Sequence, residues 1–119
     1  MYTSQQTNAP WGISRVSTRQ QPITKEYNYP VSAGTGVDAY IIDTGIFIAH
    51  PEFEGRARLG KSFTKDGPKD GNGHGTHVAG TIGSRTYGIA KNVTLIAVKV
   101  LDARGAGTFQ FDLGDFFLI

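Results

Sequence analysis

The sequence contains no cysteine among its 119 residues, which excludes a disulfide framework and any metal site built on thiolates. It also lacks an apolar run of the roughly 18 residues that a membrane-spanning helix requires. The first residues, Met-Tyr-Thr-Ser-Gln-Gln-Thr-Asn, have neither the basic nor the apolar region of a signal peptide. From these absences we expect no membrane partner and no export signal within this chain.

A strong charge of one sign is also missing. Twelve Lys and Arg residues stand against ten Asp and Glu residues, a net charge of +2, and the basic residues form no cluster. We therefore expect no nucleic-acid partner. The hydrophobic content of 39% and the 16 glycines are typical of a globular chain with many loops. A chain of this length forms one domain at most and can bury about two thirds of its unfolded surface.

The pattern of apolar residues predicts two strands with a helix between them. Residues 37–42 form an apolar run that ends in Asp43-Thr44-Gly45, and residues 94–101 are β-branched and almost continuously apolar. Residues 74–84 are small and predict a helix. Strand, helix and strand make a βαβ unit, with parallel pairing and a right-handed crossover. Residues 56–63 alternate loosely and predict a short edge strand.

Glycine is frequent in the predicted helix, and proline is frequent before the first strand. Gly75, Gly80 and Gly83 each cost the helix about 1 kcal/mol relative to alanine. We therefore expect the helix to pack closely against the sheet. Residues 1–36 form a polar arm broken by prolines, in which Trp11, Ile13 and Val16 predict a short amphipathic turn docked on the core.

Two residues in this pattern suggest proton-transfer chemistry. Asp43 lies at the carboxyl end of a predicted parallel strand, the edge where sites gather in α/β sheets. His74 begins the glycine-rich helix, where Gly73 and Gly75 leave room for a substrate backbone. An aspartate can fix the tautomer of a histidine and stabilise its imidazolium form. Taken singly, Asp43 is more readily explained as a turn cap, and His74 as a loop histidine without a role.

The histidines allow a second interpretation as a metal site. His74, His77 and Asp43 together could bind zinc, but zinc sites on helices more often place a glutamate between histidines at i and i+4. Here glycine and threonine lie between them, so no general base is supplied. We therefore expect no metal site and interpret His77 as a buried structural residue. His50 precedes a proline and is expected to be a solvated turn residue.

Two short motifs have weaker meaning. Asn92-Val93-Thr94 matches the acceptor sequence for N-linked glycosylation, which matters only in an exported protein. Gly105-Ala106-Gly107 follows a strand as phosphate loops do, but it lacks the lysine and the hydroxyl residue of a P-loop.

Taken together, the motifs resemble those of the subtilisin-like serine proteases. The matching segments are VDAYIIDTG (37–45), HPEFEGR (50–56), DGNGHGTHVAGTIGS (70–84) and VKVLD (98–102). TNAPWGI (7–13) and RTYGIA (85–90) are most similar to the fungal proteinase K branch. The resemblance runs from about residue 6 to residue 108, and its motifs occur in the order and at the spacing of the family.

The resemblance implies an Asp-His-Ser catalytic triad and an extended peptide or protein substrate. By that resemblance Asp43 is the triad aspartate and His74 the general base, in the chain order of this family. Leu101 resembles a wall of the pocket beside the histidine. Gly105, Ala106 and Gly107 resemble the edge strand that pairs with substrate, a mode in which main-chain hydrogen bonds give affinity. The resemblance also implies secretion, a monomer in the full-length form, and a pro-region inhibitor as a further partner.

The sequence departs from the family pattern in what it lacks. Family members carry the serine in a Gly-Thr-Ser-Met-Ala segment far downstream, and no such segment occurs here. The principal calcium ligands of the family would also lie beyond Ile119, so we expect no cofactor in this chain. Residues 109–119 form a divergent tail after the family-like core of residues 37–108, as a frame shift or a retained intron would produce.

The expected fold is α/β: a partial subtilisin-like parallel sheet with a βαβ crossover, truncated before the half that bears the nucleophile. The expected function by family is a serine-type endopeptidase, with the isolated chain inactive because only Asp43 and His74 of the triad are present. The alternative is a truncated product without catalysis, or a module that binds peptides.

Overall fold

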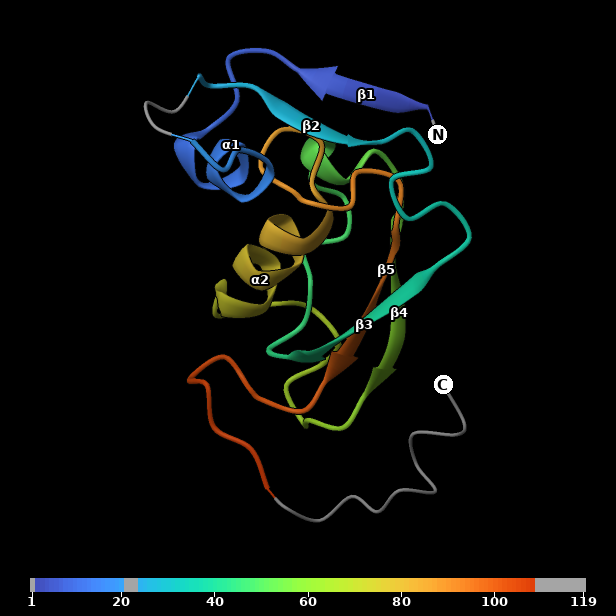
Figure 1. Ribbon diagram of the computed structural model, residues 1–119. Helices are drawn as coiled ribbons and strands as arrows, with labels where there is room; N and C mark the ends of the chain where they lie inside the picture. Colours follow the sequence, from blue (N-terminus) through green and yellow to red (C-terminus); the bar gives the residue numbers. More distant parts are fainter. Residues whose placement is uncertain (1, 21–23, 109–119) are drawn as a thin grey trace.

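The computed structural model describes residues 2–20 and 24–108. Within them the chain forms a three-stranded sheet, a helix on one face of it, and a small N-terminal unit (Figure 1). In chain order the elements are β1 (Thr3–Gln6), α1 (Trp11–Ser17), β2 (Tyr27–Pro30), β3 (Asp38–Asp43), the 3-10 helix η1 (Pro51–Phe53), β4 (Ala57–Ser62), α2 (His74–Gly83) and β5 (Thr94–Lys99).

The sheet is parallel, in the order β3-β5-β4. This confirms the predicted strands and the edge strand at 56–63, which is β4. The chain passes from β3 to β4 first, and β5 later fills the position between them. Asp38 pairs with Thr94 and Asp43 with Lys99, so the carboxyl ends of β3 and β5 meet at one edge of the sheet. Because β5 is central, its residues from Leu95 to Lys99 are all buried.

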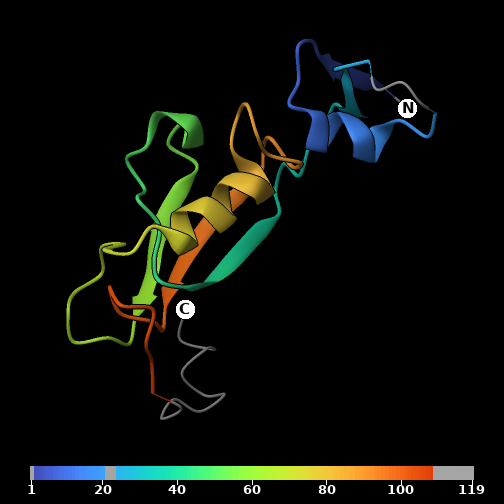
Figure 2. The same ribbon diagram turned by 90° about the vertical axis from the view of Figure 1, so that its left-hand side faces the viewer.

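Small residues allow α2 to lie close to the sheet, as the glycines predicted. Figure 2 shows α2 running along one face of the sheet. The buried residues of α2 are Gly75, Ala79 and Gly83, four apart and therefore on one side of the helix. A Cβ at Gly83 would lie 2.5 Å from Val93 Cγ1. The core beneath α2 contains Ile41, Ile46, Phe53, Ala57, Ala79, Val93, Leu95 and Ala97.

The N-terminal arm is more ordered than the sequence predicts. β1 and β2 pair antiparallel, and α1 packs beside them around a small core of Ala9, Ile13 and Tyr27. The expectation that Trp11 and Val16 dock on the main core is wrong, because these side chains are 74% and 67% exposed. The strands were missed because residues 3–6 are all polar and show no apolar alternation, and because α1 separates the two strands along the chain.

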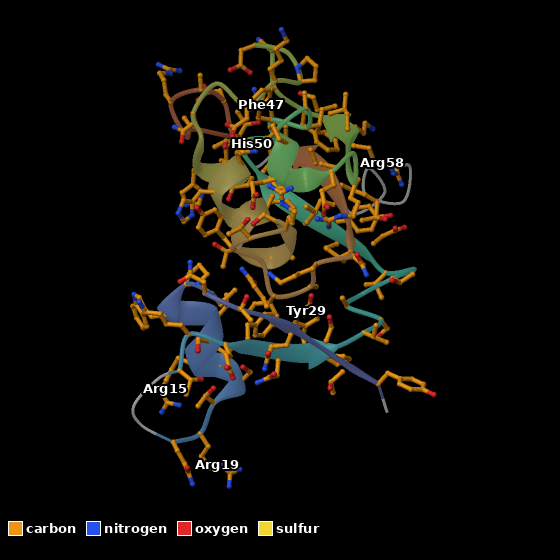
Figure 3. All side chains as sticks on the ribbon, turned by 90° about the horizontal axis from the view of Figure 1, so that it is seen from above. Arg15, Arg19, Tyr29, Phe47, His50 and Arg58 are labelled. Carbon is orange, nitrogen blue, oxygen red and sulfur yellow. The ribbon has the colours of Figure 1, made fainter. Side chains whose placement is uncertain are left out.

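The arm contacts the rest of the molecule through both of its strands. The Tyr27 hydroxyl donates a hydrogen bond to the Ile89 carbonyl oxygen at 2.7 Å. Lys91 Nζ lies 5.3 Å from the Tyr27 ring centroid and 5.7 Å from that of Tyr29, within the range of cation–π attraction. Figure 3 shows Tyr29 on the side of the arm that faces the rest of the molecule. Gln6 of β1 also donates from Nε2 to the Thr86 carbonyl oxygen at 3.0 Å, so the arm is anchored at more than one point.

Among the described residues, no helix combines the length and the apolar character needed to cross a bilayer. The divergent tail at 109–119 lies outside the described residues.

Candidate active site

Asp43 is held at the end of β3 by the backbone around it. Its carbonyl oxygen accepts hydrogen bonds from the N–H groups of Val100, at 3.0 Å, and Leu101, at 3.2 Å. These bonds tie the strand end to the chain that leaves β5. The Thr44 N–H donates to Asp43 Oδ1 at 2.7 Å and fixes the carboxyl group. The Asp43 side chain is 13% exposed, so it is largely shielded from water.

His74, the first residue of α2, faces this carboxyl group. Its Nδ1 lies 2.8 Å from Asp43 Oδ1 and 2.9 Å from Oδ2. An ionised carboxylate only accepts hydrogen bonds, so the Nδ1 atom of His74 carries a proton and donates a hydrogen bond to Asp43. In the neutral imidazole Nε2 is then unprotonated and able to accept a proton.

The two partners differ sharply in exposure. The His74 side chain is 66% exposed, against 13% for Asp43. Among the described residues no group hydrogen-bonds to His74 Nε2. The arrangement therefore presents a basic nitrogen to the surface while a shielded carboxylate orients the ring from behind. Chemically it can remove a proton from a group placed beside Nε2 and stabilise the imidazolium that results.

Asp70 fixes the loop from which His74 emerges. Its Oδ1 accepts hydrogen bonds from the Thr44 hydroxyl at 2.8 Å and the Gly73 N–H at 2.9 Å. Its Oδ2 accepts from the Thr76 N–H at 3.0 Å and from the Thr76 hydroxyl. One carboxylate thus joins the residue after Asp43 to the first turn of α2, where the helix dipole favours a negative charge.

These bonds lower the pKa of Asp70. Burial alone would raise the pKa, but hydrogen bonds to the charged form, led by that from Gly73 N–H, outweigh burial and lower it to about 2. Sequence reasoning missed this residue. The signal was present in Asp-Gly-Asn-Gly, because aspartate before glycine favours turns in which its side chain accepts backbone hydrogen bonds.

A close backbone approach brings the start of α2 to the end of β3. A Cβ at Gly75 would lie 2.1 Å from the Gly45 carbonyl oxygen, so only glycine fits there. The Gly75 N–H donates to the Thr44 hydroxyl at 2.8 Å. Gly45 has φ +108°, in the region that favours glycine. The Asp-Thr-Gly and His-Gly-Thr motifs are therefore in contact, and this contact sets the spacing of Asp43 and His74.

Lys99 stabilises the same end of the sheet and was also missed. It is buried, with 1% of its side chain exposed. Its Nζ donates to the Lys69 carbonyl oxygen at 2.6 Å and lies 3.1 Å from Asp66 Oδ1. Asp66 has a pKa lowered to about 2, chiefly by the hydrogen bond from the Thr64 hydroxyl. The buried cation thus fixes the loop that leads to Asp70.

The predicted substrate-binding residues lie in the loop after β5. Leu101 is half-buried, and its N–H donates to the Asp43 carbonyl oxygen. Gly105, Ala106 and Gly107 are exposed and belong to no strand. The loop closes on Asp102, whose N–H donates to the Ala106 carbonyl oxygen at 2.8 Å and whose Oδ1 accepts from the Ala106 N–H at 3.0 Å.

Two histidine predictions are corrected by the structure. His77 is exposed, not buried, because the buried side of α2 is set by Gly75 and Ala79, and His77 lies about 200° around the helix from Gly75. His50 is half-buried: its Nδ1 accepts the Glu52 N–H at 3.1 Å, and its ring meets those of Phe47 and Phe53 edge to face. Figure 3 shows Phe47 and His50 side by side.

The zinc interpretation requires Asp43, His74 and His77 to lie close together. Within residues 2–20 and 24–108, no three His, Asp or Glu side chains are grouped closely enough to hold a metal ion. His77 is therefore not brought to Asp43 and His74.

Comparison with known proteins gives a consistent result. A family model described as the subtilase family matches residues 34–113. Proteinase T of Parengyodontium album is 59% identical over 104 residues, and a subtilisin-like protease of Coccidioides posadasii is 60% identical over 105. Each match covers 87% of this chain but only 35% and 26% of the respective relative. The chain thus spans about a third or less of the length of these curated relatives.

Solved structures agree with the sequence matches. The crystal structure of a cold-adapted subtilisin-like serine proteinase superposes with a TM-score of 0.79 at 47% identity, over 86% of this chain and 38% of that one. Because the family model matches most of the chain and the fold agrees with that of a solved member, the chain belongs to the subtilase family of serine proteases.

Proposed function

We propose that Asp43 and His74 are two members of the catalytic triad of a subtilisin-like endopeptidase that hydrolyses peptide bonds. The observation that carries the proposal is the 2.8 Å contact between His74 Nδ1 and a shielded Asp43 carboxylate, with the remainder of the ring exposed. Subtilase relatives of this chain bear names such as Proteinase T and cuticle-degrading protease.

In this mechanism His74 Nε2 takes the proton of a serine hydroxyl as the oxygen attacks the substrate carbonyl. Asp43 holds the ring in the required tautomer and stabilises the imidazolium, which then protonates the leaving amine. The chain has six serines, and none in the described part hydrogen-bonds to His74. All six lie within the described residues, so the proposal places the nucleophile in a part of the full-length protein that this chain, about a third of the length of Proteinase T, does not contain.

The substrate of the proposal is an extended peptide or protein segment. Gly105, Ala106 and Gly107 are exposed, and within the described residues the Gly107 backbone makes no hydrogen bond. The main-chain groups of Gly107 are therefore free to pair with a substrate strand, whereas the Gly105 N–H and both main-chain groups of Ala106 are bonded to Asp102. In this proposal Leu101, whose side chain lies next to Gly107, supplies a wall of the pocket beside His74. Secretion, a monomeric full-length form and inhibition by a pro-region are parts of the same proposal, as is calcium bound elsewhere in the full-length fold.

The test is a chimera in which residues 6–108 of this chain replace the matching segment of Proteinase T. The chimera should hydrolyse a chromogenic peptide. In subtilisin, the type enzyme of the family, loss of the histidine lowers kcat by about a million-fold and loss of the aspartate by about 10⁴. We expect losses of the same order for His74→Ala and Asp43→Ala in the chimera.

The matched control is His77→Ala. His77 is an exposed histidine on the same helix, so this variant should keep the kcat of the chimera within about two-fold. A chimera that folds and hydrolyses peptide equally well with His74→Ala would overturn the proposal. A folded chimera that binds an extended peptide but never hydrolyses it would favour the alternative, a peptide-binding module without catalysis.

A further inference from the structure

We propose that Asn92 is a site of N-linked glycosylation, a modification that rests on the proposed passage of the protein through the secretory pathway. Asn92-Val93-Thr94 is the only Asn-x-Ser/Thr triplet in the sequence, since the other three asparagines, Asn8, Asn28 and Asn72, lack the hydroxyl residue two positions on. Such a triplet can be glycosylated in the folded protein only where the asparagine side chain is exposed and a sugar on it displaces no native contact.

The local structure leaves the Asn92 side chain available. Asn92 is exposed in a turn immediately before β5, between the buried residues Lys91 and Val93. Its backbone is fixed, because the N–H donates to the Ala33 carbonyl oxygen at 2.8 Å. Within the described residues its side-chain amide makes no hydrogen bond. A sugar on this nitrogen would therefore break no native contact, while the turn would hold it at a constant position.

The backbone of the threonine of the triplet is also fixed. Thr94 is the first residue of β5 and is half-buried, and its N–H donates to the Val37 carbonyl oxygen at 3.0 Å. Lys91 and Val93 anchor the turn from below: the Lys91 ammonium donates to the carbonyl oxygens of Arg85 and Gly88 at 2.8 and 2.9 Å. In this turn Lys91 and Val93 are thus buried, whereas the acceptor Asn92 between them is exposed.

The site lies at the opposite end of the sheet from the candidate active site. Thr94 pairs with Asp38 at the amino end of β3, and Lys99 pairs with Asp43 at the carboxyl end. The two pairs are five residue steps apart along the strand, about 17 Å at the usual rise of a strand. In Figure 1 the β5 arrow points away from the turn before it and toward the loop of residues 100–108. The acceptor therefore lies at the end of β5 away from His74.

The reaction needs a co-reactant, an oligosaccharide carried on an isoprenoid diphosphate. The Asn92 amide nitrogen attacks the anomeric carbon of the sugar and loses one proton to the transferase. The bond between that carbon and the diphosphate oxygen breaks, and the isoprenoid diphosphate leaves with the electron pair. The product has a new nitrogen–carbon bond and no change in oxidation state.

The test is expression of the full chain behind a cleavable leader in a yeast secretory pathway, followed by gel mobility and intact mass. We expect a slower-migrating form that an amidase specific for N-glycans converts to the unmodified mobility, turning Asn92 into Asp. Asn92→Gln and Thr94→Val should abolish the shift completely. Thr94→Ser should keep it, and so should Asn28→Gln, which changes an exposed asparagine outside the triplet.

The readout does not depend on proteolysis, so its failure is separate from failure of the proposed function. A chain that enters the pathway, as shown by leader removal, yet has the unmodified mass would overturn the proposal. A shift that persists in Asn92→Gln would also overturn it. If the Asn92→Gln chain is degraded, Thr94→Val and Thr94→Ser still separate loss of the acceptor sequence from loss of folding.

Discussion

At the scale of single residues, the site depends on two carboxylates with different roles, those of Asp43 and Asp70. Asp43 orients the ring of His74, whereas Asp70 never touches the ring and instead holds the loop and the first turn of α2. Asp70 is therefore a positioning residue. Because the pKa of Asp70 is lowered on folding, the ionised carboxylate is more stable in the folded state than in the unfolded chain. The contribution of Asp70 to the free energy of unfolding therefore depends on pH.

We predict that Asp70→Asn lowers the free energy of unfolding at neutral pH and that the difference from the parent shrinks in acid. The carboxylate contributes above its ordinary pKa of 3.8 and loses its contribution as the pH falls toward about 2. After a discount for partial exposure, we expect the ionised form to contribute roughly 1 kcal/mol. Urea unfolding of the chimera in a His74→Ala background, which prevents self-digestion, measures the difference at each pH.

The control for this prediction is Asp38→Asn, which changes an exposed aspartate at the opposite end of β3. It should leave the free energy of unfolding almost unchanged at every pH. A difference between Asp70→Asn and the parent that stays constant from neutral pH to pH 2 would show that the charge of Asp70 does not stabilise the fold.

At the scale of elements, glycines decide how closely α2 approaches the sheet. On the buried side of the helix the space for a side chain is absent at Gly75, whereas at Gly80 the nearest atom to an added Cβ is Ser84 Oγ at 4.0 Å. Two glycines in one helix therefore have opposite expected effects on stability when replaced by alanine. One is required by the contact between the Asp43 and His74 motifs, and the other only lowers helix propensity.

We predict that Gly75→Ala destabilises the chimera strongly and separates His74 from Asp43. A Cβ 2.1 Å from the Gly45 carbonyl oxygen forces the backbone apart, at a cost of about 3 kcal/mol or more by comparison with overpacked cores. Gly80→Ala, the matched control, should stabilise the helix by up to about 1 kcal/mol. Thermal unfolding and kcat measure the two effects, and equal melting temperatures for both variants would contradict the argument.

At the scale of the whole molecule, one face of the sheet has no helix over it in the described part of the chain. Tyr40 and Ile42 point to the face opposite α2 and are 46% and 51% exposed. A second apolar surface is a hollow of about 1000 Å³ between α1 and α2, lined by residues that include Trp11, Val16 and Tyr87. Exposed apolar surfaces of this kind favour association.

We predict that the 119-residue chain alone binds a hydrophobic dye and self-associates. Tyr40→Lys together with Ile42→Thr should reduce both effects without loss of helical signal, because these side chains are exposed. Ile41→Lys, on the buried face at 3% exposure, should unfold the chain instead. Dye fluorescence, light scattering and circular dichroism distinguish the outcomes. A monomeric chain with a sharp two-state urea transition and no dye binding would refute the prediction.

The sequence by itself determined the three strands of the parallel sheet, the helix at 74–83 and the pairing of Asp43 with His74, because apolar periodicity and long motifs record local structure directly. The close packing of α2 also followed from its glycines. The tertiary structure alone decided the role of Asp70, the burial of Lys99, the exposure of His77 and the antiparallel pairing of β1 with β2. Each of these depends on which side of an element meets a neighbour distant in sequence, and only the assembled fold brings those neighbours together.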